Sequence, residues 1–209
     1  MLHLPRHDGG TRLVLVRHLD PDESVSGRAY GALEAPLAPA ARRRAELLAR
    51  QLEALPLAAV YSSPLRRARD TAAPIAARHG LVPVTHDGLR EIEFGELEGR
   101  LYEEIEVGWP ELFRSWMEEP TRTRFPGGES FADLRARVLA ASDEIRGRHT
   151  GATIAVVAHG GVTRTVLAAA LTMPDEALFR LDQCYGGVSV VDWFGDVPLV
   201  RLVNATTFA

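Results

Sequence analysis

Two of the seven histidines in this 209-residue sequence directly follow uninterrupted apolar runs, and their positions suit catalysis. Arg17 and His18 come after "RLVLV" (12–16), and His159 comes after "TIAVVA" (153–158). Open α/β sheets bind ligands at the carboxyl ends of their strands, so both imidazoles are expected at one site. An imidazole there can act as nucleophile, acid or base near neutral pH. The remaining histidines lie in tails, helix ends or loops: His3, His7, His79, His86 and His149.

The residues around His159 and in a second segment predict that this site binds an oxyanion. "HGGVTRTVLAAAL" places Gly160 and Gly161 before a helix expected to begin near Val162, which lets backbone N–H groups and the helix N-terminus approach an anion. "SSPLRRARDTA" (62–72) predicts another helix start, with Arg67 in its opening turn. Two imidazoles and two guanidinium groups together suit phosphate, because a guanidinium can donate two parallel hydrogen bonds to it.

The second segment has a simple capping interpretation. Ser62 or Ser63 is expected to cap the helix, and Pro64 suits its first position. Arg67 then points toward the crevice, while Arg66 and Arg69 are expected on a solvated face.

Strands and helices alternate along most of the chain, which predicts crossover connections and a parallel sheet covered on both faces. Expected strands are 12–16, 58–62, 81–85, 153–158, 187–193 and 197–203, and expected helices are 39–55, 65–79, 129–148 and 161–171. The fold class is therefore α/β, a three-layer α/β/α sandwich with a mostly parallel central sheet. "FGD" (194–196) is too short to contain a helix and predicts a hairpin that forms an antiparallel edge strand.

Residues 96–128 break this rhythm and are rich in Glu, Trp, Pro and Arg. We interpret them as a helical cap inserted over the ligand end of the sheet; a plain connecting excursion is the alternative. The whole chain, 1–209, is expected to form a single domain. Trp109, Trp116 and Tyr30 could line a pocket for a ring or belong to the core of the cap.

Composition excludes several classes of function. Basic and acidic residues nearly balance, 24 against 28, so no nucleic-acid or membrane partner is expected. All 24 basic residues are arginine, which excludes Schiff bases and the lysine of phosphate-binding P-loops. The single Cys184 can form neither an internal disulfide nor a cysteine zinc site. "MLHLPRHDGG" does not have the apolar core of a signal peptide, and a cytoplasmic protein is expected.

Five motifs in order resemble the histidine phosphatase superfamily, in its phosphoglycerate-mutase-like branch. They are "LVLVRH", "SSPLRRARDTA", "LREIEFGELEG", "PGGESF" and "VVAHGG", spread over residues 12–193. The resemblance implies that His18 is the phosphoryl-accepting nucleophile, that Arg17, Arg67 and His159 bind the phosphate, and that Glu91 is the proton donor. It also implies a small phosphorylated metabolite as substrate, and neither a metal nor a cofactor. Composition alone does not separate Glu91 from its neighbours Glu93, Glu96 and Glu98.

The loop after His18 departs from the commonest family pattern. Leu19, Pro21 and Ser24 stand where many members have Gly, Thr and Asn, so the usual substrate contacts of this loop are altered, and Ser24 is a candidate replacement. "RHLDPDESVSGRAYGALEAPL" is similar to the alpha-ribazole phosphatase subgroup, which implies a nucleotide-like monophosphate. A cofactor-dependent phosphoglycerate mutase and a non-catalytic phospho-ligand binder remain alternatives. The mutase is disfavoured because the Glu-Arg-His-Tyr-Gly run of mutases is missing here. The non-catalytic binder is disfavoured because the chain has all five site residues of the family: Arg17, His18, Arg67, Glu91 and His159.

Overall fold

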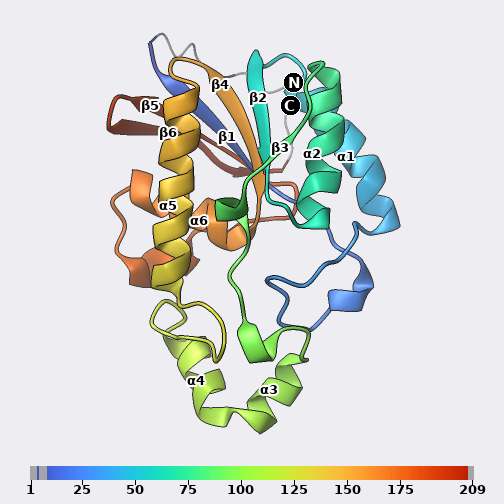
Figure 1. Cartoon of the computed structure of the whole chain (residues 1–209), viewed down its shortest axis with the longest axis vertical. Coiled ribbons are helices and arrows are strands. Elements are labelled where there is room, and N and C mark those ends of the chain that lie inside the picture. Colours follow the sequence, from blue (N-terminus) through green and yellow to red (C-terminus); the bar gives the residue numbers. More distant parts are fainter. Residues whose placement is uncertain (1–3, 5–8, 207–209) are drawn as a thin grey trace.

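The computed structural model describes residues 4 and 9–206, so His3 and His7 lie outside the described residues. One six-stranded sheet has the order β3-β2-β4-β1-β5-β6 (Figure 1). Its strands are β1 (Thr11–Arg17), β2 (Leu57–Ser62), β3 (Val84–Thr85), β4 (Thr153–Ala158), β5 (Val188–Phe194) and β6 (Val197–Ala205). The first four strands in this order pair in parallel. The predicted, mostly parallel sheet is confirmed.

The apolar runs of β1 and β4 occupy the middle of the sheet because both of their faces are covered. Leu13 and Leu15 face one core, which also contains Val156, whereas Val14 and Val16 face the other. This alternation is the two-residue period of a strand, and burial on both faces explains why Leu13–Val16 and Ile154–Ala158 are apolar throughout. Each such side chain contributes roughly 1.5–3 kcal/mol when fully buried.

Two helices cover each face of the sheet, as the three-layer prediction requires. The first core contains residues of α5 and α6, and the second contains residues of α1 and α2 (Figure 1). The helices are α1 (Pro39–Leu52), α2 (Arg66–Arg78), α3 (Tyr102–Gly108), α4 (Pro110–Glu118), α5 (Phe131–Arg148) and α6 (Gly160–Ala170). Short 3-10 helices cover Glu23–Val25, Asp87–Leu89, Gly95–Leu97 and Asp175–Arg180.

The two sides of the sheet end differently. On one side, β5 runs opposite to β1 and turns through Gly195, at a φ of +62°, into the edge strand β6, so the predicted hairpin is confirmed. On the other side, the expected strand 81–85 shrinks to Val84–Thr85. Pro83 has no N–H to donate to a neighbouring strand, and Val82 is 82% exposed.

Residues 96–128 form the predicted helical cap. Helices α3 and α4 lie beyond the carboxyl ends of the strands, at the lower end of the molecule in Figure 1. They enclose a small core of their own, formed by the buried side chains Leu97, Ile105 and Phe125 with Ala29. The cap therefore closes over the edge of the sheet where Arg17 and His18 emerge.

Candidate active site

The parallel pairing of β1 with β4 brings the two predicted histidines together. Arg17 is in register with Ala158, and the His18 N–H donates to the Ala158 carbonyl at 2.9 Å. The His18 and His159 rings lie edge to face, with centroids 5.0 Å apart. Both are buried, at 2% and 0% exposure. Their proximity follows from the topology, since each residue comes directly after one of two neighbouring parallel strands.

His18 is held as a neutral imidazole with one nitrogen free. Its Nδ1 lies 2.7 Å from the Leu19 carbonyl, which can only accept, so Nδ1 carries the proton and Nε2 keeps its lone pair. Burial lowers the pKa of His18 well below its usual value, and the charges of Arg67 and Arg17 lower it further, while the bond to Leu19 opposes the shift. Burial has a larger effect on this pKa than either arginine.

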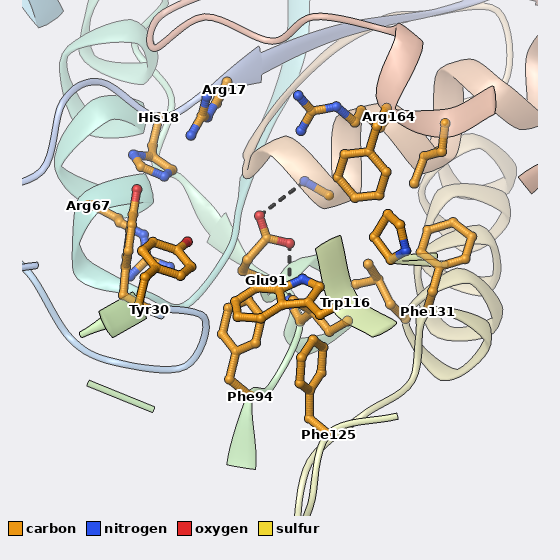
Figure 2. A pocket seen from close by; sticks show the side chains of 17 residues that line it. Arg17, His18, Tyr30, Arg67, Glu91, Phe94, Trp116, Phe125, Phe131 and Arg164 are labelled. Atoms are coloured by element: carbon orange, nitrogen blue, oxygen red, sulfur yellow. Dashed lines mark hydrogen bonds between the residues drawn. The ribbon is translucent and has the colours of Figure 1, made fainter. Parts of the chain in front are cut away.

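Arg17 and Arg67 present guanidinium groups to the same pocket (Figure 2). Arg17 donates through Nη1 to the Gln183 carbonyl, and its Cζ lies 3.9 Å from the centre of the Tyr185 ring. Arg67 is fully buried and donates to the carbonyls of Gly31 and Leu33, at 2.7 Å each. Among the described residues, the buried Nε of each arginine has no hydrogen-bond partner. Two guanidinium groups whose side-chain hydrogen bonds go to neutral carbonyls favour an anion in this pocket.

The predicted start of the second helix is wrong in detail. α2 begins at Arg66 after Leu65, without a side-chain cap, although Arg67 still lies in its opening turn. The Ser63 hydroxyl instead lies 2.8 Å from Nε2 of His159, and it accepts a bond of 3.3 Å from the Leu65 N–H. The Ser63 hydroxyl therefore keeps a local bond to the Leu65 N–H and adds a tertiary contact with His159, while the helix itself begins only at Arg66.

His159 lies behind the pocket wall. Burial lowers its pKa well below the usual value, and the proximity of His18, Arg67, Arg17 and Arg137 lowers it further, so its ring is neutral. Its buried Nδ1 has no partner among the described residues. The Ser63 hydroxyl proton needs an acceptor, and Nε2 of His159 is the one within reach.

Glu91 faces the pocket across from His18 and is fixed by two backbone donors (Figure 2). Its Oε1 accepts from the Ile92 N–H and its Oε2 from the Gly161 N–H, at 3.0 Å each. α6 begins at Gly160, two residues earlier than expected, and the anion at its N-terminus is the Glu91 carboxylate. Gly161 lines the pocket; Gly160 is buried beneath Arg17 and Arg164.

The competing carboxylates have other positions. Glu98 accepts hydrogen bonds from the N–H groups of Gly31 and Ala32, so it fixes the loop whose carbonyls hold Arg67. Glu93 forms an ion pair with Arg90 at 3.4 Å, and Glu96 is exposed. Of these four carboxylates, Glu91 is the one that lines the pocket.

Ser24 does not join this group. It is exposed in the 3-10 helix Glu23–Val25, where its N–H donates to the Asp22 side chain at 3.0 Å. The proposed replacement contact is therefore not formed in this structure. Tyr30 is the residue from the same loop that lines the pocket, and its hydroxyl is hydrogen-bonded to that of Tyr185.

The pocket has a volume of about 230 Å³ and is polar at one end and aromatic at the other (Figure 2). The aromatic end combines side chains from the cap and from the first turns of α5 and includes Phe94, Tyr102, Trp116, Phe125 and Phe131. Trp116 and Tyr30 thus line the pocket, as one of the two interpretations predicted, whereas Trp109 packs in the core of the cap and beneath Arg100.

Sequence reasoning missed two residues at the polar end. Arg164 lines the pocket from α6, and it follows Gly161 by three residues, a spacing that puts both on one helical face. This spacing was a usable signal. Tyr185 lies in an irregular segment and stacks against Arg17, with its ring centre 5.4 Å from that of His18. No periodicity in the sequence points to it.

Two absences are observed in the described part of the chain. No group of three or more His, Cys, Asp or Glu side chains is arranged to hold a metal ion. No helix there is both long and apolar enough to cross a membrane.

Comparison with known proteins assigns the arrangement to a family. The profile of the histidine phosphatase superfamily (branch 1) matches residues 13–206. Phosphoserine phosphatase 1 of Hydrogenobacter thermophilus is 39% identical over 160 residues, which are 77% of this chain and 76% of that protein. A bifunctional protein of Mycobacterium tuberculosis is 37% identical over 95% of this chain, which spans 55% of that protein's length. The structure of alpha-ribazole phosphatase from Shigella flexneri has a TM-score of 0.86 at 25% identity, with 95% of this chain and 98% of that chain covered.

The chain therefore belongs to the histidine phosphatase superfamily, branch 1. Within it, the chain is an enzyme of the phosphatase class. The resemblance of the five sequence motifs to this superfamily is confirmed.

Proposed function

We propose that this chain hydrolyses monophosphate esters of small organic molecules in two displacements, with His18 as the covalent nucleophile. One observation carries the proposal. The Nε2 lone pair of a neutral, buried His18 lies in the same pocket as two guanidinium groups with unpaired Nε atoms and one carboxyl group. Phosphoryl transfer needs an aligned nucleophile and fixed positive charge around the equatorial oxygens, and these residues provide both.

The first displacement forms a bond between His18 Nε2 and phosphorus and breaks the bond between phosphorus and the ester oxygen. Arg17 and Arg67 bind the phosphoryl oxygens. Glu91, in its protonated form, gives its proton to the departing oxygen, so the alcohol leaves neutral. In the second displacement, water attacks phosphorus, Glu91 takes a proton from it, and the N–P bond breaks. The products are inorganic phosphate and the original neutral His18, and no metal takes part.

His159 supports the phosphoryl group as a neutral donor. The Ser63 hydroxyl donates its proton to Nε2, which leaves the proton of the His159 ring on Nδ1. Nδ1–H is then free to donate to a phosphoryl oxygen, and it is the buried atom that has no partner among the described residues. Ser63 thus acts as a positioning residue that sets the tautomer of His159.

The aromatic end of the pocket receives the leaving group. Three of its side chains, Tyr102, Trp116 and Phe125, come from the cap, so residues 96–128 contribute to substrate choice while residues of the sheet edge perform the chemistry. That residues 1–209 act as one catalytic domain with this cap is part of the proposal. Esters of nucleotide-like alcohols, such as alpha-ribazole phosphate, remain candidates because a planar ring can stack against Trp116 and Phe94.

The test compares wild type with His18→Ala on p-nitrophenyl phosphate. The wild type is expected to release phosphate, and His18→Ala to be inactive while its circular dichroism spectrum is unchanged. Wild-type turnover by His18→Ala would refute the mechanism. Interconversion of 3- and 2-phosphoglycerate, stimulated by 2,3-bisphosphoglycerate and faster than phosphate release, would instead identify a mutase.

A further inference from the structure

The polar end of the pocket contains one cation that the proposed phosphoryl transfer does not use, Arg164. It projects from α6 into the pocket beside Arg17 (Figure 2). Its Nε donates to the Leu181 carbonyl at 2.8 Å, and its Cζ lies 5.3 Å from the centre of the Phe179 ring. These two contacts fix the direction of the guanidinium and leave both of its terminal nitrogens available for a ligand.

Arg164 has no acidic partner in the part of the chain that the structure describes. No carboxylate of residues 4 and 9–206 lies within 4.0 Å of its guanidinium nitrogens. The nearest negative charges, Glu91 and Asp182, are bound elsewhere: Glu91 by two backbone N–H groups, and Asp182 by the Gln183 N–H and the Asn204 amide. A half-buried cation that is fixed in direction but unpaired is a site awaiting an anion.

A second cation lies next to it. A Cβ placed on Gly160 would stand 3.0 Å from Nη1 of Arg164 and 3.5 Å from Nε of Arg17, so the glycine lets the two guanidinium groups come together. Burial and the charge of Arg17 lower the pKa of Arg164, and Glu91 and Asp182 oppose this shift. Two neighbouring cations repel each other unless anions bind to both.

We propose that Arg164 binds a carboxylate on the leaving-group half of the substrate, so that the enzyme selects monophosphate esters that carry a second negative charge close to the ester oxygen. The inference rests on the proposed function, which assigns the phosphate to Arg17 and Arg67. The two free nitrogens of Arg164 match the two oxygens of a carboxylate.

The experiment compares esters that differ only in charge. One pair is 3-carboxyphenyl phosphate and 3-carbamoylphenyl phosphate; a shorter pair is 2-phosphoglycolate and its amide. kcat/KM is measured for wild type, Arg164→Gln and Arg164→Lys, together with inhibition by inorganic phosphate. Turnover of the two amide esters, which lack the carboxylate, tests the phosphatase proposal independently of the role proposed for Arg164.

The wild type is expected to prefer the carboxylate in at least one pair, and Arg164→Gln to reduce that preference by about 10- to 100-fold, the effect of losing a charged, paired hydrogen bond. Its activity on the amides and its inhibition by phosphate should change less than about threefold, since Arg164 is not expected to touch the phosphoryl group. Arg164→Lys should retain part of the preference, although it lacks the bond to Leu181. No carboxylate preference in wild type, or equal losses on both members of each pair, would overturn the proposal.

Discussion

Acid should destabilise the fold through the two active-site histidines, and the effect can be worked out from their environment. Both rings are buried, and burial is the largest cause that lowers each pKa well below 6.5. In the unfolded chain each histidine takes up a proton near pH 6.5, whereas in the folded state it does not. Between those two values the unfolded state binds more protons, so stability falls as the pH falls.

The magnitude follows from linkage. From pH 7.5 to 5.5, one histidine that stays neutral in the folded state lowers the free energy of unfolding by about 1.4 kcal/mol, and two lower it by about 2.7 kcal/mol. Below the folded-state pKa values the loss levels off. Carboxylates contribute little in this window because their usual pKa values are lower.

Urea unfolding at pH 7.5, 6.5 and 5.5 in phosphate-free buffer measures this effect. His18→Asn and His159→Asn should each remove about half of the pH dependence, and the double variant nearly all of it. Phosphate-free buffer matters because bound phosphate stabilises the folded state by itself. If the double variant kept the wild-type pH dependence, the histidines would titrate normally and the neutral nucleophile would be refuted.

Two further substitutions test individual roles in the mechanism. Glu91→Gln should slow the hydrolysis of an alkyl phosphate about 100-fold or more, and that of p-nitrophenyl phosphate less than about tenfold, because p-nitrophenolate leaves without a proton. Steady-state kinetics on both esters measures this difference. Equal losses on the two esters would show that Glu91 only shapes the pocket. Ser63→Ala should lower kcat about tenfold, since His159 loses the contact that sets its tautomer, and should lower the urea midpoint because the buried Leu65 N–H and His159 ring lose a partner. Ser62→Ala is the matched control, because the Ser62 hydroxyl donates to the Ser63 carbonyl and not to His159. Equal losses of kcat in Ser62→Ala and Ser63→Ala would contradict the role of Ser63.

The residues that could be predicted from the sequence are those whose place depends on topology. Arg17, His18 and His159 end buried apolar runs, and neighbouring parallel strands must bring such positions to one edge of a sheet. Arg67 follows for the same reason, as it lies in the first turn after β2. The assignment of Glu91 depended on the family resemblance, because its loop has no pattern that separates it from the nearby carboxylates.

The errors share a physical cause, which is competition between local and tertiary partners. Ser63 accepts a local bond from the Leu65 N–H, but its hydroxyl also contacts His159, and the helix begins at Arg66 instead of at Pro64. Ser24 stands where the family places a substrate ligand, but Asp22 caps a turn there and leaves Ser24 exposed. Arg164 was missed although its spacing places it on the same face of α6 as Gly161, because the packing of the helix on the sheet decides which face points into the pocket.

The most direct test of the central claim is to trap the phosphorylated enzyme. Wild type is mixed with a fast-leaving aryl phosphate, quenched in alkali within milliseconds, digested, and sequenced by mass spectrometry with fragmentation that preserves the N–P bond. We predict a single phosphate in the wild type, on Nε2 of His18. In the Glu91→Gln enzyme the same phosphate should be detectable until all of the ester has been turned over. A phosphate on any other residue, or hydrolysis with inversion at phosphorus and no phosphorylated enzyme, would contradict it.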